Sequence, residues 1–590
     1  MKRPRIIAVL VFSFILITGY LLAPKPPLLE GVGFSTAVYD RDDRLLRLTL
    51  AGDEVFRLFT PLADISPALI EGTLLYEDKH FRLHPGVNPY SLVRALASTY
   101  FGGRRIGGST ITMQVARVRY GINSRTISGK LRQILKAVQI ERHYSKNEIL
   151  EAYLNFVPYG GNINGAGAAS RVYFNKNAGR LTLAEALTLA VIPQSPRRRT
   201  PGKTSNNENI ELISARSALF TKWVARHPED SEKTPFIKLP MTTYARSGLP
   251  FLAPHFVDGR LKEHPDERDI KTTLDIKLQE ILERKTRSYI ERKRDVGLTN
   301  ASAMLIDYTS MEVLALLGSA DFFNDKIEGQ VNGTRGKRSP GSTLKPFIYA
   351  LAMDQGLIHP LSMLKDSPLG FGAYSPENYD NDFEGPIKAK DALIKSRNIP
   401  ALALANRLSE PTLYEFLNAA SVTGLRSEAF YGLALVLGGA EMTMEELVRL
   451  YAMLANRGEM KELKVVKDER VESGKRLVSE EAAFLSLDML KDNTRPDEKF
   501  REQWTGARLP VYWKTGTSYG FRDAWSVAVF GPYVLAVWMG NFSGEGDPAF
   551  IGRSAAAPLL FEIIDAVKTS GKKVEEPKRN GVKNLTEVQV

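Results

Sequence analysis

Eighteen consecutive uncharged residues near the N-terminus, "IIAVLVFSFILITGYLLA" over 6–23, most constrain what this chain can be. A helix of this length spans about 27 Å, close to the thickness of a bilayer core. The basic residues Lys2, Arg3 and Arg5 precede it and favour retention of that end inside the cell. A cleaved signal peptide is the alternative, but the run is long for that role. We therefore predict a cytoplasmic stub and transmembrane helix over 1–23, with everything from Pro24 outside.

Length, cysteine content and charge narrow the classes further. A chain of 590 residues is too long for one hydrophobic core and should divide into domains. The absence of cysteine excludes disulfides, thiol nucleophiles and thiolate metal sites. The formal charge of +12 suits an anionic partner, and the extracytoplasmic placement argues against nucleic acid.

Periodicity and turn signals predict two folded domains of different class. Helical patterns joined by glycine-rich loops dominate 40–225, which we expect to be mostly α. Residues 226–270 are rich in proline and charge and suggest a linker, and 571–590 suggest a polar tail. Over 271–570 we expect an α/β domain with an antiparallel sheet, because "ASAMLIDYTSMEVLALLG" and "DAWSVAVFGPYVLAVWMG" have the form of strand hairpins.

One helix, predicted from Gly129 to about residue 143, raises the question of what its polar side holds. Leu131 and Leu135 recur at helical spacing on its apolar side. We therefore expect Lys130 and Gln133 on the opposite, more polar side.

Three short segments in the second domain carry groups that suit nucleophilic catalysis. "SPGSTLKPF" places Ser342 and Lys345 one helical turn apart, and a neutral lysine amine can take the proton of an adjacent serine. "SRN" supplies a hydroxyl and an amide, Ser396 and Asn398. "KTGTS" begins at Lys514, just before the last hairpin, where an edge strand could bind a substrate backbone.

Each segment alone is common, but the three in this order resemble the active-site serine signature of penicillin-recognising enzymes. The resemblance implies that Ser342 attacks a D-alanyl-D-alanine carbonyl, that Lys345 takes its proton and that Ser396 relays a proton to the leaving nitrogen. It also implies substrate binding by Asn398 and by the strand residues Lys514, Thr515, Gly516 and Thr517. Backbone N–H groups of Ser342 and Thr517 would form the oxyanion hole.

The first domain resembles the peptidoglycan glycosyltransferase family through "YEDKHFRLHPG", "GGSTITMQVAR" and "GKLRQ". With the second domain, the chain resembles a bifunctional class A penicillin-binding protein, closest to the 1C branch. This implies a lysozyme-like, mostly helical domain in which Glu77 is the base that takes a proton from the acceptor sugar. The second of these motifs, "GGSTITMQVAR", begins at Gly107. The implied substrate-binding residues are Asp78, Phe81, His84, Ser109, Thr110, Thr112, Gln114, Arg117, Lys130 and Gln133.

Gln133 departs from the glutamate that most of this family carries. An amide there removes a negative charge beside a diphosphate and cannot bind a divalent metal as a carboxylate does. We therefore expect no dedicated metal site and a weakened metal dependence, with Lys130 and Arg117 supplying positive charge. His80 and His84 have a zinc-compatible spacing, but Pro85 ends the helix that would align them.

The resemblance, with the predicted N-terminal span, implies a peptidoglycan synthase of the bacterial inner membrane, with its catalytic domains on the periplasmic side. It would polymerise lipid II and cross-link stem peptides through a penicillin-sensitive acyl-enzyme. Expected partners are lipid II, nascent peptidoglycan, membrane lipids, cell-wall assembly proteins and inhibitory β-lactams. Two alternatives stay open: a β-lactam sensor or scaffold with weak catalysis, and a DD-carboxypeptidase.

Overall fold

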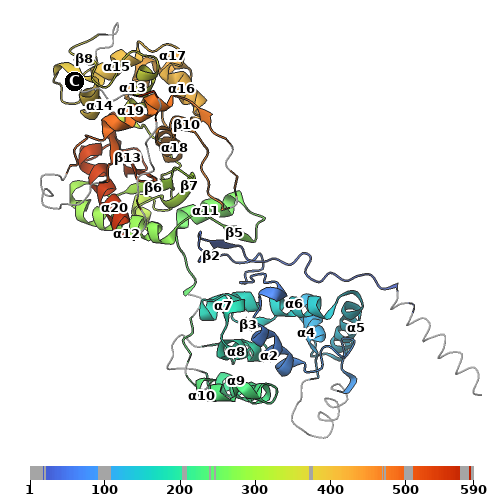
Figure 1. Ribbon diagram of the computed structural model, residues 1–590. Helices are drawn as coiled ribbons and strands as arrows, with labels where there is room; N and C mark the ends of the chain where they lie inside the picture. Colours follow the sequence, from blue (N-terminus) through green and yellow to red (C-terminus); the bar gives the residue numbers. More distant parts are fainter. Residues whose placement is uncertain are drawn as a thin grey trace, which may run out of the picture. The chain divides into compact units, whose positions relative to one another are not determined.

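The computed structural model places most of the chain in two units (Figure 1). It describes residues 18, 22–90, 108–201, 209–237, 239, 241–244, 248–370, 376–467, 469–470, 473–496, 509–571, 574, 582 and 584–585. The first unit comprises Met1–Val38, Arg47–Phe251 and Asp266–Asp269, and the second comprises Tyr39–Leu46, Leu252–Pro265 and Ile270–Val590. Among the described residues no helix is both long and apolar enough to cross a bilayer. The predicted span over 6–23 lies almost wholly outside them.

The first unit is mainly helical, as predicted. Its α2 begins with a proline at the first turn and ends at Glu77, and a capping box between Ser145 and Glu148 opens α6. Within the unit α2 packs against α8 and α9, and α4 packs against α5 and α6. The helices are α2 (Pro67–Glu77), α4 (Ile111–Arg119), α5 (Ile127–His143), α6 (Lys146–Phe156), α7 (Ala166–Phe174), α8 (Leu183–Val191), α9 (Ile210–Val224) and α10 (Thr234–Ile237), with the short strands β3 (Pro158–Gly160) and β4 (Ile163–Asn164).

The predicted faces of α5 are wrong. Gln133 is only 1% exposed, whereas Leu131 is 58% and Leu135 is 71% exposed. Gln133 can be buried because both ends of its amide have partners: Oε1 accepts from Lys130, and Nε2 donates to the Met113 carbonyl on α4 (2.6 Å). Leu131 and Leu135 thus face outward, whereas the amide faces the core together with Ala137 and Ile140, because satisfied hydrogen bonds remove the cost of burying it.

The second unit is built on a five-stranded antiparallel sheet of order β12-β13-β14-β6-β7. Both predicted hairpins are confirmed: β6 pairs with β7, and β13 pairs with β14. The KTG segment forms β12 at one edge, paired with β13 so that Lys514 lies opposite Val527. The strands are β6 (Ala301–Asp307), β7 (Glu312–Leu317), β12 (Tyr512–Thr517), β13 (Asp523–Phe530) and β14 (Tyr533–Gly540).

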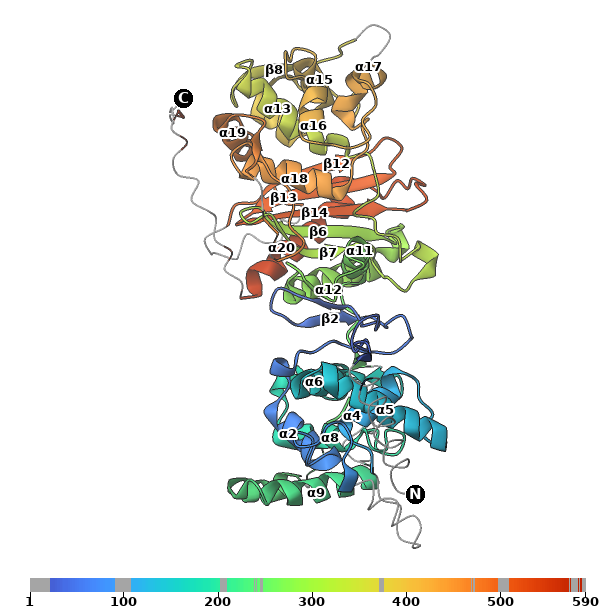
Figure 2. The ribbon, with the colours of Figure 1, turned by 90° about the vertical axis from the view of Figure 1, so that its right-hand side faces the viewer.

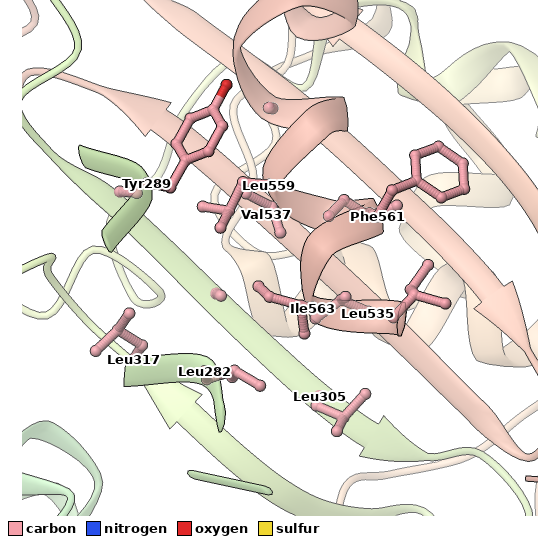
Figure 3. Close-up of a cluster of buried hydrophobic side chains, with 14 of the residues drawn as sticks. Leu282, Tyr289, Leu305, Leu317, Leu535, Val537, Leu559, Phe561 and Ile563 are labelled. Atoms are coloured by element: carbon pink, nitrogen blue, oxygen red, sulfur yellow. The ribbon is translucent and has the colours of Figure 1, made fainter. Parts of the chain in front are cut away.

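Helices cover both faces of this sheet (Figure 2). On one face, α12 and α20 pack on the strands through apolar side chains that Figure 3 draws, among them Leu282, Leu305, Leu535 and Ile563. On the other face α18 contacts β13, β14 and β6. The helices are α11 (Pro254–Glu263), α12 (Ile276–Lys293), α13 (Lys345–Asp354), α14 (Ala389–Ile394), α15 (Asn398–Ala405), α16 (Leu413–Ala419), α17 (Glu428–Tyr431), α18 (Met444–Ala455), α19 (Glu480–Leu490) and α20 (Ala557–Thr569).

Smaller sheets complete the chain. A three-stranded sheet has the order β2-β1-β5, and two-stranded sheets pair β8 with β9 and β10 with β11. Their strands are β1 (Ala37–Tyr39), β2 (Leu45–Leu48), β5 (Asp269–Lys271), β8 (Met363–Asp366), β9 (Gly385–Lys388), β10 (Glu459–Met460) and β11 (Lys475–Arg476).

Candidate active sites

The turn that carries Ser342 is pressed against the edge strand β12. Ser342 lies in a short 3-10 helix, Gly341–Leu344, that leads directly into α13. A Cβ added at Gly516 would lie 2.2 Å from the Pro340 carbonyl oxygen, so only glycine permits this approach. Gly341 has a φ of +52°, which glycine adopts without strain. The nucleophile turn and the KTG strand are thus held together by backbone contact.

Lys345 is fully buried and is fixed by the SRN segment. Its Nζ donates to the carbonyl oxygen of Ser396 (2.6 Å) and to Asn398 Oδ1 (2.7 Å). Burial, reinforced by the charges of Lys514 and Arg397, lowers the pKa of Lys345 well below its usual value. A neutral amine has two N–H bonds and one lone pair. The two short bonds use both hydrogens, and the lone pair is left to accept a proton.

Lys514 and Ser396 close the chain of polar groups. Lys514 Nζ donates to Ser396 Oγ (2.7 Å) and to its neighbour's carbonyl, that of Thr515 (3.0 Å). Burial, together with the charge of Arg553, lowers the pKa of Lys514 to about 7. Ser342 is half-buried, and its hydroxyl has no hydrogen-bond partner among the described residues. The structure therefore brings the three predicted segments together around a free hydroxyl.

An ion pair that the sequence analysis missed positions the SRN segment. Arg397, between the two predicted residues, is buried and its Nε donates to Asp366 (2.7 Å). Asn378 donates to the same carboxylate and accepts from the backbone N–H of Asn398 (2.8 Å). Ser396 adopts a left-handed φ of +59° within this framework. Only the tertiary fold brings these groups together, so local motifs gave no signal for them.

The side chains that follow Lys514 have different surroundings. The hydroxyl of Thr517 accepts from the backbone N–H of Gly552 (3.0 Å). In the SRN segment, Asn398 Nδ2 donates to the Glu377 carbonyl (2.8 Å). Thr515 is half-buried, and Gly516 supplies the close approach described above. The strand end is therefore anchored on both sides before any substrate binds.

In the first unit, Glu77 is a half-buried residue whose two carboxylate oxygens differ in their hydrogen bonding. Gln114 Nε2 donates to its Oε2 (2.7 Å), and its Oε1 is buried without a partner among the described residues. Burial raises the pKa of Glu77, against the opposing effects of the Gln114 bond and of the charges on Arg117 and Arg199. The sequence analysis did not single out Arg199, which donates to Tyr76 Oη (2.7 Å) beside Glu77.

Arg117 lies near this carboxylate, and a second cation, Lys130, lies near Arg117. Lys130 Nζ donates to Ser109 Oγ (2.7 Å) and to Gln133 Oε1 (3.1 Å). Burial and the nearby charge of Arg117 lower the pKa of Lys130. Arg117 is half-buried, and no acceptor among the described residues pairs with its guanidinium. The structure thus brings Ser109, Arg117, Lys130 and Gln133 together with a partly unsatisfied positive charge.

The other predicted residues of this unit form the frame of the site. Asp78 contacts His84 Nε2 (3.0 Å) and accepts from the backbone N–H of Ile111 at the start of α4 (3.1 Å). Thr110 caps the same helix by accepting from Met113. Thr112 donates to Glu141 (2.5 Å), and Phe81 is buried under the ammonium of Lys146. Gly107 lies outside the described residues.

No group of three or more His, Cys, Asp or Glu side chains that could hold a metal occurs among the described residues. The carboxamide oxygen of Gln133, the one donor in the predicted position, already accepts from an ammonium group. At this position the described residues therefore offer an amide oxygen that already accepts a hydrogen bond, in place of a carboxylate.

Each of the two units matches a known protein family. A transglycosylase family profile matches residues 44–221, and a penicillin binding protein transpeptidase domain profile matches residues 301–528. Penicillin-binding protein 1C of Escherichia coli (strain K12) is 36% identical over 535 residues, 90% of this chain and 68% of that protein. Penicillin-binding protein 1F of Bacillus subtilis (strain 168) is 28% identical over 574 residues, 89% of this chain and 78% of that protein.

The fold is also similar to a solved structure. The crystal structure of penicillin-binding protein 1A from Haemophilus influenzae matches with a TM-score of 0.53 at 17% identity, covering 93% of this chain and 94% of that chain. The family assignment rests on the two matched domains in this order and on the relative that is 36% identical to this chain. The two sites described above agree with it. The chain belongs to the class A penicillin-binding proteins, bifunctional enzymes that synthesise and cross-link peptidoglycan.

Proposed function

We propose that Ser342 is the acylated nucleophile of the cross-linking reaction. Its Oγ attacks the carbonyl of the penultimate D-alanine while its proton passes to the lone pair of Lys345. As the peptide C–N bond breaks, Ser396 gives its proton to the departing nitrogen and is replenished along its contacts with Lys345 and Lys514. An amine of a second stem peptide then takes the acyl group and releases Ser342. The burial of Lys345, which favours its neutral form, supports this assignment.

In the first unit, Glu77 acts as the base of glycan polymerisation. Its unpaired Oε1 can take the proton of the acceptor sugar hydroxyl, while Gln114 holds the other oxygen in place. A raised pKa suits a general base, because a more basic carboxylate accepts the proton more readily. The substrate is lipid II, whose diphosphate leaves as the new glycosidic bond forms.

Side-chain cations, and no divalent metal, stabilise the departing diphosphate. Arg117 has no acceptor for its guanidinium among the described residues, and Lys130 is held in position by Ser109 and Gln133. The test is lipid II polymerisation by the full-length protein in chelator and in Mg²⁺ or Mn²⁺. We expect similar rates in all three conditions, and a strict metal requirement would overturn the assignment.

The exposed apolar stripe of α5 supports contact between the first unit and the membrane surface. Ile127, Leu131 and Leu135 are spaced by four residues and are 83%, 58% and 71% exposed. Arg125 and Arg132 are exposed beside them and suit anionic headgroups. The chain would be anchored by a single N-terminal span, with both catalytic units on the periplasmic side.

The lack of native cysteine makes this contact testable with one label. A polarity-sensitive fluorophore is attached to Leu135→Cys. Its emission maximum should shift to the blue when the full-length protein is in anionic nanodiscs. The reference is the same labelled protein without its N-terminal span, in buffer free of detergent. The same label on Lys222→Cys, an exposed position of α9, should not shift. Equal spectra for both positions would contradict a membrane-facing α5.

One observation carries the functional assignment: Lys345, Ser396 and Lys514 converge from distant parts of the chain beside a free Ser342 hydroxyl. The decisive experiment pairs two variants of the full-length protein. Ser342→Ala should lose labelling by fluorescent penicillin and keep glycan synthesis, whereas Glu77→Gln should do the reverse. An inert sensor or scaffold would make no glycan from labelled lipid II, and a carboxypeptidase would release D-alanine without cross-linked product.

A further inference from the structure

A cavity lined by charged and apolar side chains lies in the transpeptidase unit, among residues that neither reaction uses. Its volume is about 380 Å³, and α11, α18, strand β7 and the loop before Ser342 line it. Cavities of this size accommodate small ligands. Three guanidinium groups and four carboxylates face it, from Arg260, Arg335, Arg449, Glu263, Glu445, Glu446 and Glu462.

Most of these charges already have partners within the protein. Glu446 accepts from the backbone N–H groups of Thr423 and Thr443, both at 2.7 Å. Glu263 contacts Arg260 (2.6 Å) and Arg335, and Arg449 pairs with Glu462. Internal pairing therefore occupies most of these groups, whereas Arg260 has a single carboxylate partner among the described residues and Glu445 has a distant one.

Arg260 is the unsatisfied cation. It is 6% exposed, and its Nε is buried without an acceptor among the described residues. Its only ion-pair partner within 4.0 Å in the described part of the chain is Glu263, one helical turn away on α11. Arg260 lines the cavity and bonds Glu263 through Nη1, so an acceptor that enters the cavity and reaches another N–H of this guanidinium would be favoured.

Glu445 is the unsatisfied anion. Its side chain is 37% exposed, and its nearest counter-charge is Arg335 Nε at 3.7 Å, too far for a hydrogen bond. No donor among the described residues bonds its carboxylate. Partial burial raises the pKa of Glu445, against the opposing charges of Arg335 and Arg260.

From these two groups we infer that the cavity binds a small zwitterion of the amino-acid or dipeptide class. The ligand's carboxylate accepts from Arg260 and its ammonium donates to Glu445, so that it bridges α11 and α18. A purely anionic ligand would leave Glu445 unpaired and repelled, and a purely cationic one would do the same to Arg260. The pairing of both ends selects molecules that carry both charges.

The site is physically continuous with the nucleophile turn. Arg338 and Met442 exchange backbone hydrogen bonds (3.0 and 2.9 Å), which joins the segment before Ser342 to the start of α18. Tyr451 of α18 also donates to the Thr343 carbonyl (2.9 Å). A ligand that holds α18 would thus contact the support of the catalytic serine without entering its cleft.

Calorimetric titration of the full-length protein in detergent tests the inference. Glycylglycine is the probe, N-acetyl-glycylglycine lacks the ammonium, and glycylglycinamide lacks the carboxylate. Each titration is run with and without prior penicillin treatment, so that binding in the catalytic cleft is recognised separately. We expect saturable glycylglycine binding in both preparations and at least about ten-fold weaker binding of each blocked analogue.

Variants assign the two ends of the ligand. Glu445→Gln should weaken glycylglycine binding about ten-fold and leave N-acetyl-glycylglycine unaffected, since that analogue has no ammonium to lose. The matched control is Glu441→Gln, an exposed carboxylate outside the cavity. Arg260→Gln should instead remove the preference for a free carboxylate, and if this buried variant fails to fold, Glu445→Gln decides alone. Absence of saturable binding, equal affinity for blocked analogues, or equal affinity of Glu445→Gln and the control would overturn the inference.

Discussion

The two catalytic sites of this chain use burial in opposite directions. In the transpeptidase unit, desolvation lowers the pKa of Lys345 well below its usual value and favours its neutral amine. In the glycosyltransferase unit, desolvation raises the pKa of Glu77 and makes a stronger base of a carboxylate. The same physical cost, that of removing a charge from water, therefore acts in opposite directions on the two proposed bases, Lys345 and Glu77.

The two sites also differ in what opposes that cost. Lys345 has short hydrogen bonds on both available N–H groups, whereas Glu77 has one satisfied and one unsatisfied oxygen. The first site is thus closed around its base, and the second leaves a gap for the acceptor hydroxyl. A buried base thus needs enough hydrogen-bond partners to fix its position, but it must keep one lone pair free to accept a proton.

The largest expected effect comes from removing the closed site's base. Lys345→Met should slow acylation by fluorescent penicillin by about 1000-fold, because the serine proton loses its acceptor. Glycan synthesis should not change. The exposed Lys365→Met is the matched control. Acylation within a few-fold of wild type, with unchanged thermal unfolding, would show that another group takes the proton.

Breaking the frame of the closed site should be the next largest effect. Arg397→Met leaves the Asp366 carboxylate buried without its cation and should cost about 3–5 kcal/mol of unfolding free energy in this unit. Denaturant unfolding of the transpeptidase transition measures the change. Adding Asp366→Asn to the variant should recover part of the loss. A cost below about 1 kcal/mol would mean that the pair does not hold the SRN segment.

In the open site, Gln133→Glu tests why the chain carries an amide there. A carboxylate cannot donate to the Met113 carbonyl, so we expect a loss of about 2 kcal/mol in unfolding free energy together with stimulation of glycan synthesis by Mg²⁺. The control is Gln139→Glu, whose bond to the Pro24 carbonyl is solvent-exposed. Equal stability of the two variants would argue against a structural role for the buried amide.

Opposite pH dependences should give the smallest effects. Lys514 must be protonated to bind a substrate carboxylate, so the second-order acylation rate should fall about ten-fold between pH 7 and pH 8.5. Lys514→Arg should remove this fall. Glycan synthesis should instead fall on acidification, because the raised pKa of Glu77 brings its protonation closer to neutral pH. Parallel profiles for both activities would contradict the comparison.

The sequence alone was sufficient for features that depend on neighbours in the chain. The one-turn spacing of Ser342 and Lys345, both hairpins, the KTG edge strand and the Ser145 capping box follow from local periodicity and turn chemistry. Glu77 was identified through its motif, since local sequence places it at the end of α2.

Other features required the tertiary structure. The faces of α5 were predicted wrongly, because Gln133 is buried only through a partner on α4, 20 residues away. Arg397 was not predicted as a site residue, because its ion-pair partner Asp366 lies 31 residues away in the chain. Arg199 and Glu445 gave no local signal at all.

Thus the amino-acid sequence by itself determined which helices and strands form and which reactive groups they carry. The tertiary structure decided which polar groups lose water and which distant partners compensate them. The physical reason is that helix and strand formation depends on interactions a few residues apart, whereas the free energy of burying a charge depends on every group that surrounds it.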